Sequence, residues 1–274
     1  MPSPAPRRNR VCKRAVVQRT ERITPHMIRV VLTSDDFAGN GFTDTYVKLL
    51  FGQDGVEYPE PLDMGVVRET YPSEQWPTMR TYTVRAWDEA TRELTIDFVH
   101  HGDEGVAGPW AASAQPGDVL WFNGPGGAYA PDEAADWHLL VGDESALPAI
   151  GAAVEQLPAG ARATVLVEVA DETEQQKFGT SADVDVQWLH RADGARGDAL
   201  VAAVEALDFP AGTPHVFVHG EAGFVFRIRK NLFQERALPR DRVSLSGYWR
   251  LGKNEDGWQA EKADTRKREE AAAN

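Results

Sequence analysis

The pattern of apolar residues changes near residue 136, and this change limits the folds open to the chain. Before it, short segments rich in β-branched and aromatic residues are separated by turn residues, with no long helical segment between them. After it, strand-like apolar segments alternate with helical segments. The first pattern is typical of an antiparallel sheet and the second of βαβ units, so we expect two domains of different class.

The first half predicts a β-barrel. Strands are expected at 27–32, 46–51, 80–86, 93–99 and 118–122. Several short strands without long helices between them favour a closed or nearly closed antiparallel barrel. The segment 53–79 is rich in Pro and Glu and shows no periodicity, so it is interpreted as a long loop.

The second half predicts a parallel sheet covered by helices. Strands are expected at 138–142, 163–169, 184–189 and 215–219, and helices at 145–157, 198–207 and 221–234. The predicted organisation is therefore a flexible basic arm at 1–15, a barrel domain at 16–135, an α/β domain at 136–252 and an exposed C-terminal helix at 253–274.

Charge excludes some partners. The chain has 29 Lys and Arg against 42 Asp and Glu, a formal net charge of −13, which argues against non-specific nucleic-acid binding. A local basic pocket for an anionic ligand stays possible. Residues 1–22 carry seven of the basic side chains. An arm that binds nucleic acid or anionic lipid is one interpretation, and a solvated tail leading into the first strand is the one we favour.

Cysteine content and hydropathy bear on the compartment. Cys12 is the single cysteine, so the chain forms no internal disulfide and no four-cysteine iron–sulfur or zinc site. No apolar run approaches the roughly 20 residues that span a bilayer, and the first residues lack the apolar stretch of a signal peptide. We expect a cytoplasmic protein without membrane insertion.

The first motif with chemical potential lies on the strand predicted at 80–86. Side chains alternate along a strand, so in Arg80-Thr81-Tyr82-Thr83 the Arg80 and Tyr82 side chains share one face. A guanidinium can clamp a phosphate, a tyrosine ring can stack on a ring system, and Thr83 could reach a ring nitrogen. An ordinary exposed strand is the alternative interpretation of this motif taken alone.

The second motif runs from Val99 to Ala111. A strand ends in a glycine-rich turn and leads into a short helix at 107–112, where backbone N–H groups can approach a phosphate. The adjacent His100 and His101 point in opposite directions on a strand, so we expect no shared metal ion and no metal site.

The third motif, Gly142-Asp143-Glu144-Ser145, joins a predicted strand to a helix. In open α/β sheets a nucleotide pyrophosphate binds at such a turn, although the G-x-G-x-x-G fingerprint is absent here. Ser145 as a plain helix N-cap is the alternative. Gly220-Glu221-Ala222-Gly223 repeats the arrangement at a later strand. A barrel followed by an α/β domain is one way to hold two planar cofactors face to face at the domain junction.

Together these motifs resemble the siderophore-interacting protein family, which comprises flavin-dependent ferric-siderophore reductases of the ferredoxin-reductase superfamily. The resemblance spans roughly residues 16–252 in order. Its motifs lie at 23–30, 46–51, 80–85, 101–111, 124–127, 140–150 and 246–252.

The resemblance implies three groups of site residues and no catalytic side chain, because the chemistry would take place on the flavin. The implied FAD site comprises Arg80, Thr81, Tyr82, Thr83, Val99, His101, Gly102, Ala107, Gly108, Trp110 and Trp249. The implied NAD(P)H site comprises Gly142, Asp143, Glu144, Ser145, Glu221 and Ala222. Lys48 and Arg250 match basic positions that the family is thought to use near the ferric siderophore.

The chain also departs from the family pattern. Gly108 stands where relatives often have Ser or Thr, so we expect one side-chain contact to FAD fewer. Pro109 and Gly126 stand where relatives often have basic residues, so we expect a less positive substrate pocket. Asp171 and Glu172 follow a predicted strand, where an acid can bond a ribose 2′-hydroxyl and repels a 2′-phosphate; they favour NADH over NADPH.

The expected activity is hydride transfer from NAD(P)H to FAD, followed by single-electron reduction of siderophore-bound Fe(III) and release of Fe(II). Three alternatives stay open. One is a reductase of the same fold with a flavodoxin or ferredoxin partner, which the net charge of −13 does not favour. The others are a siderophore-binding module without turnover and a reductase whose flavin receives electrons from a protein.

Overall fold

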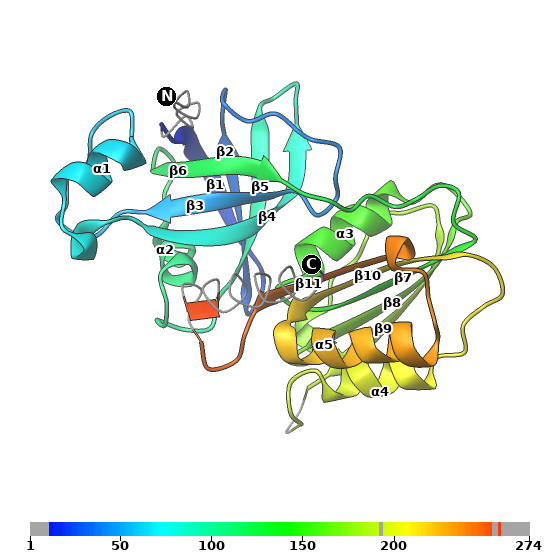
Figure 1. Ribbon diagram of the computed structural model, residues 1–274. Coiled ribbons are helices and arrows are strands. Elements are labelled where there is room, and N and C mark those ends of the chain that lie inside the picture. Colours follow the sequence, from blue (N-terminus) through cyan, green and yellow to red (C-terminus); the bar gives the residue numbers. More distant parts are fainter. Residues whose placement is uncertain (1–10, 192–193, 254–256, 259–274) are drawn as a thin grey trace, which may run out of the picture. The chain divides into compact units, whose positions relative to one another are not determined.

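The chain divides into two compact units between Gly127 and Ala128 (Figure 1). The computed structural model describes residues 11–191, 194–253 and 257–258. The first ten residues of the expected basic arm and nearly all of the C-terminal helix expected at 253–274 lie outside these residues. Within the described part of the chain, every helix is too short or too polar to cross a membrane.

The first unit is a closed six-stranded antiparallel barrel, as predicted. Its strands follow each other around the barrel in the order β1-β2-β5-β4-β3-β6. Their bounds are β1 Lys13–Thr24, β2 Met27–Thr33, β3 Tyr46–Phe51, β4 Thr78–Asp88, β5 Glu93–Val99 and β6 Val119–Gly126. Five of the six correspond to predicted strands, and β1 is the addition.

The strand β1 corrects the expected arm at 1–15. Lys13 pairs with Phe122 and Ala15 with Leu120 on β6, so the barrel begins three residues earlier than predicted. Cys12 is already buried, and its N–H donates to the Leu62 carbonyl at 2.7 Å. The prediction missed this strand because only a few of its side chains enter the core, and charged residues cover the rest.

The barrel interior is filled by alternate side chains from its strands. Val30, Leu32, Ile96 and Phe122 are completely buried there. Helix α2 (Ala107–Ser113) adds its small Ala side chains to this core, and half-buried aromatic rings pack against it. The β-branched and aromatic residues that predicted these strands supply much of this buried interior.

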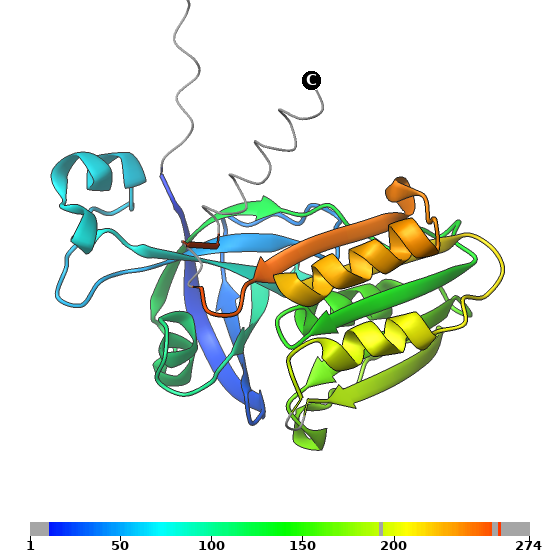
Figure 2. The ribbon, with the colours of Figure 1, turned by 60° about the horizontal axis from the view of Figure 1, so that its bottom comes forward.

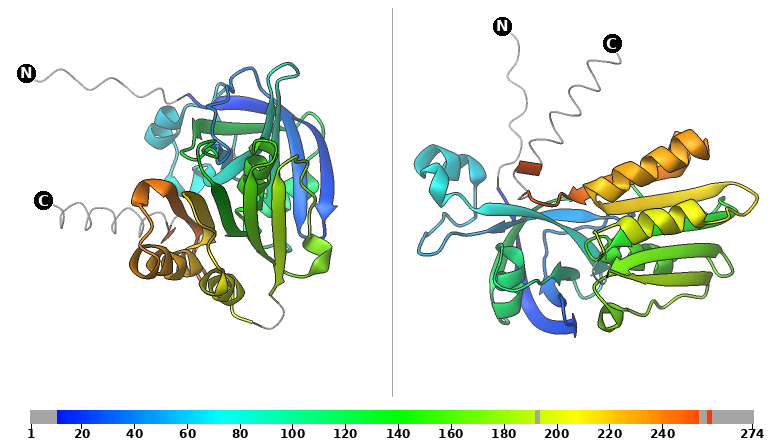
Figure 3. Two further views of the ribbon diagram at one scale, coloured as in Figure 1. Left: turned by 90° about the vertical axis from the view of Figure 1, so that its right-hand side faces the viewer. Right: turned by 90° about the horizontal axis from the view of Figure 1, so that it is seen from below.

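The segment 53–79, interpreted as a loop, contains two short helices. Helix α1 (Met64–Thr70) starts at Asp63, whose Oδ1 accepts the Gly65 N–H at 2.7 Å, and the 3₁₀ turn η1 covers Ser73–Gln75. Figure 3 shows α1 near the end of β3 and the start of β4. Leu62 and Val67 form a small cluster with Cys12 and Leu50 outside the barrel. Seven residues are too few to show a helical period, so this helix was missed.

The second unit is a five-stranded parallel sheet of order β11-β10-β7-β8-β9, which confirms the predicted class. The strands are β7 Trp137–Asp143, β8 Arg162–Val169, β9 Asp183–His190, β10 Pro214–Glu221 and β11 Val243–Trp249. The edge strand β11 was not predicted. Its residues Val243 and Leu245 are only half-buried and alternate with Ser, which weakens the strand signal.

Helices cover both faces of this sheet. Helices α4 (Asp198–Ala206) and α5 (Ala222–Lys230) lie side by side on one face, and α3 (Leu147–Gln156) covers the other (Figure 2). A π-helical turn, η3 (Asn231–Glu235), extends α5, and the 3₁₀ turns η2 and η4 cover Glu172–Glu174 and Arg240–Arg242.

The boundary between the units lies earlier than the expected residue 135. Tyr129 is buried, and its ring stacks on the His215 ring with 4.7 Å between the ring centroids. The Asp132 N–H donates to His215 Nδ1 at 3.0 Å. The segment 128–135 therefore packs with the sheet that follows it.

Candidate functional site

The Arg80–Thr83 motif lies on β4 with two faces of different character. Arg80 pairs with Leu49 and Tyr82 with Val47, so both side chains share the face that carries these buried β3 residues. The Tyr82 ring lies 4.5 Å from the Phe98 ring, measured between centroids, and is half-buried. Arg80 donates from Nη1 to its neighbour's carbonyl at 2.7 Å. The expectation that Arg80 and Tyr82 share a face therefore agrees with the register.

The other two residues of the motif differ in exposure. Thr83 is buried, whereas Thr81 is exposed on the outer face of the barrel. Lys48 pairs with Thr81 on one side and with Asn123 on the other, so it lies on that same outer face. Lys48 and Arg80 consequently occupy opposite faces of the β3–β4 ribbon.

The glycine-rich turn after β5 has the backbone conformation that its glycines permit. Gly102 and Gly105 have φ values of 85° and 82°, in the left-handed region, and His101 between the strand and these glycines is exposed. Val99 ends the strand, and the following His100 donates its N–H to the His26 carbonyl at 2.8 Å. This turn leads into α2 at Ala107.

Gly108 and Trp110 pack α2 against the barrel. A Cβ at Gly108 would lie 3.0 Å from the Val99 carbonyl oxygen, so the helix packs tightly against the end of β5. The centroid of the Trp110 ring lies 5.5 Å from that of the Phe51 ring and 5.6 Å from that of the Phe98 ring. Gly at 108 is thus explained by helix–strand packing, and Trp110 by the barrel core.

The residues of the first unit fit a flavin nucleotide in their chemistry. Tyr82 offers a half-buried aromatic ring, Arg80 offers a guanidinium two residues away on the same face, and Thr83 offers a hydroxyl. After β5, the strand that pairs with β4, the glycines of the Gly102–Gly105 turn leave the backbone open to close approach by a phosphate. The Arg80–Thr83 motif thus places a guanidinium, an aromatic ring and a hydroxyl within four residues of one strand.

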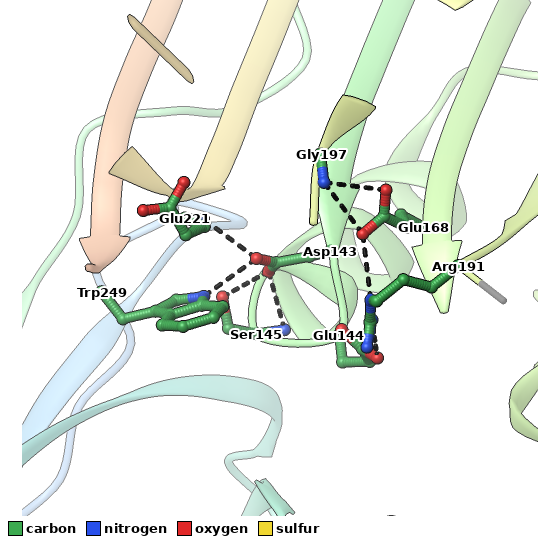
Figure 4. Close-up of polar contacts among 8 residues, drawn as sticks. All are labelled: Asp143, Glu144, Ser145, Glu168, Arg191, Gly197, Glu221 and Trp249. Carbon is green, nitrogen blue, oxygen red and sulfur yellow. Dashed lines mark hydrogen bonds and ion pairs between the residues drawn. The ribbon is translucent and has the colours of Figure 1, made fainter. Parts of the chain in front are cut away.

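In the second unit, Asp143 joins three elements at the carboxyl edge of the sheet (Figure 4). Its Oδ1 accepts hydrogen bonds from the Ser145 N–H at 3.0 Å and the Ser145 hydroxyl at 2.6 Å. Its Oδ2 accepts from the Glu221 N–H and from Trp249 Nε1, both at 2.9 Å. A carboxylate has about four acceptor positions, so these four bonds use them all.

Close backbone packing surrounds this carboxylate. A Cβ at Gly142 would lie 2.6 Å from the Ala146 Cβ and 2.8 Å from the His219 carbonyl oxygen. Gly220, with a φ of 138°, brings the next strand equally close to Asp143. Small residues at these positions allow the two strand-to-helix turns to meet.

Glu221 caps α5, the helix that begins with the buried Ala222. Its Oε2 accepts from the N–H groups of Gly223 at 2.5 Å and Phe224 at 3.2 Å, and its Oε1 accepts from the Leu251 N–H at 3.3 Å. The chain's own carboxylate therefore occupies the N-terminus that a phosphate would otherwise use. At the Gly142–Ser145 turn, by contrast, Ala146, the N-cap residue of α3, makes no side-chain cap hydrogen bond.

An ion-pair network that sequence reasoning missed lies beside this edge. Arg191 contacts Glu144 and donates from Nε to Glu168 at 3.1 Å, and Glu168 accepts the Gly197 N–H at 2.9 Å (Figure 4). Burial raises the pKa of Glu144, the charge of Asp143 adds to this, and Arg191 opposes it. The signal available in the sequence was a polar residue near the end of each of three strands.

Two further groups bear on expected substrate contacts. Asp171 accepts the Thr173 N–H at 2.8 Å and caps η2, so its position has a structural explanation besides nucleotide preference.

Trp249 is half-buried, and the guanidinium of Arg196 lies 5.5 Å from its ring centroid. Arg250 follows it and lies 5.9 Å from the Trp258 ring centroid.

A barrel followed by a parallel α/β unit is the ferredoxin-reductase-like fold. Sequence profiles agree with this division: residues 16–129 match the siderophore-interacting FAD-binding domain, and residues 135–252 match the siderophore-interacting protein domain. The chain belongs to the siderophore-interacting protein family and carries its FAD-binding domain, which confirms the resemblance drawn from the motifs.

Named relatives and solved structures extend this result. The chain is 34% identical to the ferric vibriobactin reductase ViuB of Vibrio cholerae, covering 89% of this chain and 91% of that protein. It is 33% identical to the NADPH-dependent ferric-chelate reductase of Escherichia coli, covering 85% and 91%. A siderophore utilization protein from T. fusca superposes with a TM-score of 0.76 at 38% identity, covering 89% of this chain and 94% of that one.

Proposed function

We propose that this protein is a ferric-siderophore reductase that binds FAD on its barrel unit and takes electrons from NADH or NADPH. The observation that carries the proposal is the shared face of Arg80 and Tyr82 on β4, within the region that matches the FAD-binding domain. Relatives that span nearly the same length are named as reductases of ferric vibriobactin and of ferric chelates.

The residues of the chain would bind and orient the reactants. Arg80 would pair with a flavin phosphate and the Tyr82 ring would support the flavin ring system. When bound, FAD supplies the conversion of a two-electron hydride into the single electrons that iron accepts. Lys48 and Arg250 would attract the anionic ferric complex to a protein whose net charge is −13.

The donor is proposed to be NADH in preference to NADPH. Asp171 and Glu172 are exposed after β8, and Glu144 and Glu168 both contact Arg191, which reduces its attraction for a phosphate. A nucleotide 2′-phosphate would therefore meet negative charge at this edge. Because one relative is named NADPH-dependent, both nucleotides belong in the test.

The experiment is to add FAD to the purified protein, remove excess, and record the visible spectrum before and after anaerobic NADH or NADPH. Ferric citrate and a ferrous-specific chelator are then added. We expect flavin bands that bleach with the nucleotide and Fe(II) that forms as they return. Arg80→Ala should lose bound flavin, whereas the control Arg85→Ala on the same strand should keep it.

Three outcomes would contradict parts of this proposal. A protein that binds the ferric complex but no FAD would be a siderophore-binding module. Flavin that bleaches but reduces no ferric chelate would indicate a protein acceptor. Flavin that neither nucleotide bleaches would indicate a protein donor of electrons.

A further inference from the structure

We infer that Asp143 is a positioning residue for Arg250, and that it acts by fixing the chain on both sides of this arginine. This inference rests on the proposed function, in which Arg250 attracts the ferric complex. It assigns Asp143 a role different from direct contact with a nucleotide, which its place in the strand-to-helix turn suggested.

The first support is that Asp143 has no acceptor capacity to spare. It is 3% exposed, and its two oxygens already accept the four hydrogen bonds from Ser145, Glu221 and Trp249. A ribose hydroxyl or amide would have to displace one of these donors. A buried donor left without a partner carries the full penalty of its desolvation, so such a displacement is unfavourable.

The second support is the geometry around Arg250. The residue before it, Trp249, donates its indole N–H to Asp143. The residue after it, Leu251, donates its backbone N–H to Glu221, and the Glu221 N–H in turn donates to Asp143. Arg250 therefore lies between two residues that are both held, directly or through Glu221, by the Asp143 carboxylate.

The backbone beyond Arg250 reinforces this arrangement. The Lys253 N–H donates to the Arg250 carbonyl at 3.1 Å, and Gly252 has a φ of 77°, as a tight turn requires. The strand β11 ends at Trp249, so the arginine is the first residue past the sheet.

Electrostatics and positioning predict opposite results for one substitution, which makes the inference testable. Asp143→Asn removes a negative charge from the unit that carries Arg250, so simple electrostatics predicts tighter binding of an anionic complex and a lower KM. It also replaces one acceptor oxygen of residue 143 with an NH₂ group, which cannot accept the hydrogen bonds that this oxygen received. The hydrogen bond from Trp249 or those from Ser145 are then lost. If Asp143 positions Arg250, the same substitution raises the KM for the ferric complex.

The experiment compares Asp143→Asn, Trp249→Phe and their double mutant, using FAD-loaded protein, NADH and ferric citrate. We expect each single mutant to raise the KM for ferric citrate about fivefold or more, with kcat within about twofold, and the double mutant to add little to either. Trp249→Phe keeps an aromatic ring and all charges but removes the indole N–H that donates to Asp143, so it decides the question if Asp143→Asn does not fold.

Glu168→Gln is the matched control, because Glu168 is a buried carboxylate at the same sheet edge that bonds Gly197 and Arg191 instead. Its KM for ferric citrate should stay at the wild-type value. A rise in the KM for NADH, with that for ferric citrate unchanged, would overturn the inference and return Asp143 to the nucleotide site. Additive effects in the double mutant would overturn it as well.

Binding of redox-inert gallium citrate separates this inference from the proposed function. If wild-type protein reduces no ferric citrate, the proposed function fails. Asp143→Asn and Trp249→Phe would still support the positioning of Arg250 if both bind gallium citrate more weakly than wild type. Hydrogen exchange at the Arg250 and Leu251 amides should then be faster in both. Unchanged exchange at these amides would contradict it.

Discussion

His138 on β7 and His215 on β10 are register partners in adjacent parallel strands, and their ring centroids lie 6.1 Å apart at an interplanar angle of 68°. His138 is 1% exposed, and its Nδ1 has no hydrogen-bond partner in the described part of the chain. Burial, the largest cause, and the neighbouring His215 together lower the pKa of His138 from 6.5 to about 4, against the opposing charge of Asp132. The ring is therefore neutral in the folded protein at neutral pH.

This lowered pKa predicts a loss of stability in mild acid. Between about pH 6.5 and 4 the unfolded chain binds a proton at His138 that the folded chain does not, so the free energy of unfolding falls as the pH falls. At about pH 5 the contribution is on the order of 2 kcal/mol. Burial also lowers the pKa of His215, which adds to the effect in the same direction.

Thermal unfolding at about pH 7.5 and about pH 5 checks this. His138→Leu should have a smaller difference in Tm between the two conditions than wild type, whatever its absolute stability. His26→Gln, at an exposed histidine of the barrel unit, serves as the control and should keep the wild-type difference. Equal differences in all three proteins would show that His138 is not the group responsible.

The contact of Gly108 with the Val99 carbonyl predicts that a larger side chain there is harmful. Gly108→Ser would place its Cβ 3.0 Å from that oxygen and 3.5 Å from the His100 Cα, both backbone atoms. We expect a loss of about 1–3 kcal/mol in the free energy of unfolding. Gly179→Ala, at a glycine with open space around it, should change stability little in denaturant titrations. A stable Gly108→Ser that binds FAD more tightly would instead show that α2 can shift and that the added hydroxyl contacts FAD.

The packing of Tyr82 on Phe98 predicts which part of the tyrosine matters for FAD. Tyr82→Ala removes the ring and should weaken FAD binding about tenfold or more, whereas Tyr82→Phe keeps the ring at 4.5 Å from Phe98 and should retain most of the affinity. Quenching of flavin fluorescence on titration measures both. If Tyr82→Phe were as weak as Tyr82→Ala, the hydroxyl and not the ring would be the contact.

The architecture was predictable where one face of each element is buried. The barrel strands and the parallel sheet alternate or run apolar in the sequence because their side chains enter a core. Strand β1 and strand β11 were missed for the same physical reason: they bury few side chains and are held by backbone pairing, β1 to β2 and to the distant β6, and β11 to β10. Local sequence cannot report a partner that tertiary structure supplies.

The site shows the same division. Asp143 was singled out because it ends a buried strand before a helix. Its role as an acceptor for Trp249 joins residues 106 positions apart, and the Arg191 pair with Glu144 joins residues 47 apart. Spacing along the chain carries no signal for such contacts, so the residues were found and their partners were not.

The exposure of Lys48 on the outer face of the barrel predicts a salt-sensitive role in attracting the ferric complex. Its register partners on both sides, Thr81 and Asn123, are uncharged, so neither of them neutralises its ammonium group. We expect Lys48→Ala to raise the KM for ferric citrate about threefold to tenfold at low salt, and the difference from wild type to shrink as salt is added, because added ions screen exposed charges. Lys177→Ala, at an exposed lysine of the other unit, controls for the change in net charge and should leave the KM unchanged. FAD affinity should be the same in both variants. A KM for Lys48→Ala that equals the wild-type value at low salt would mean that Lys48 only keeps the outer surface of β3 solvated.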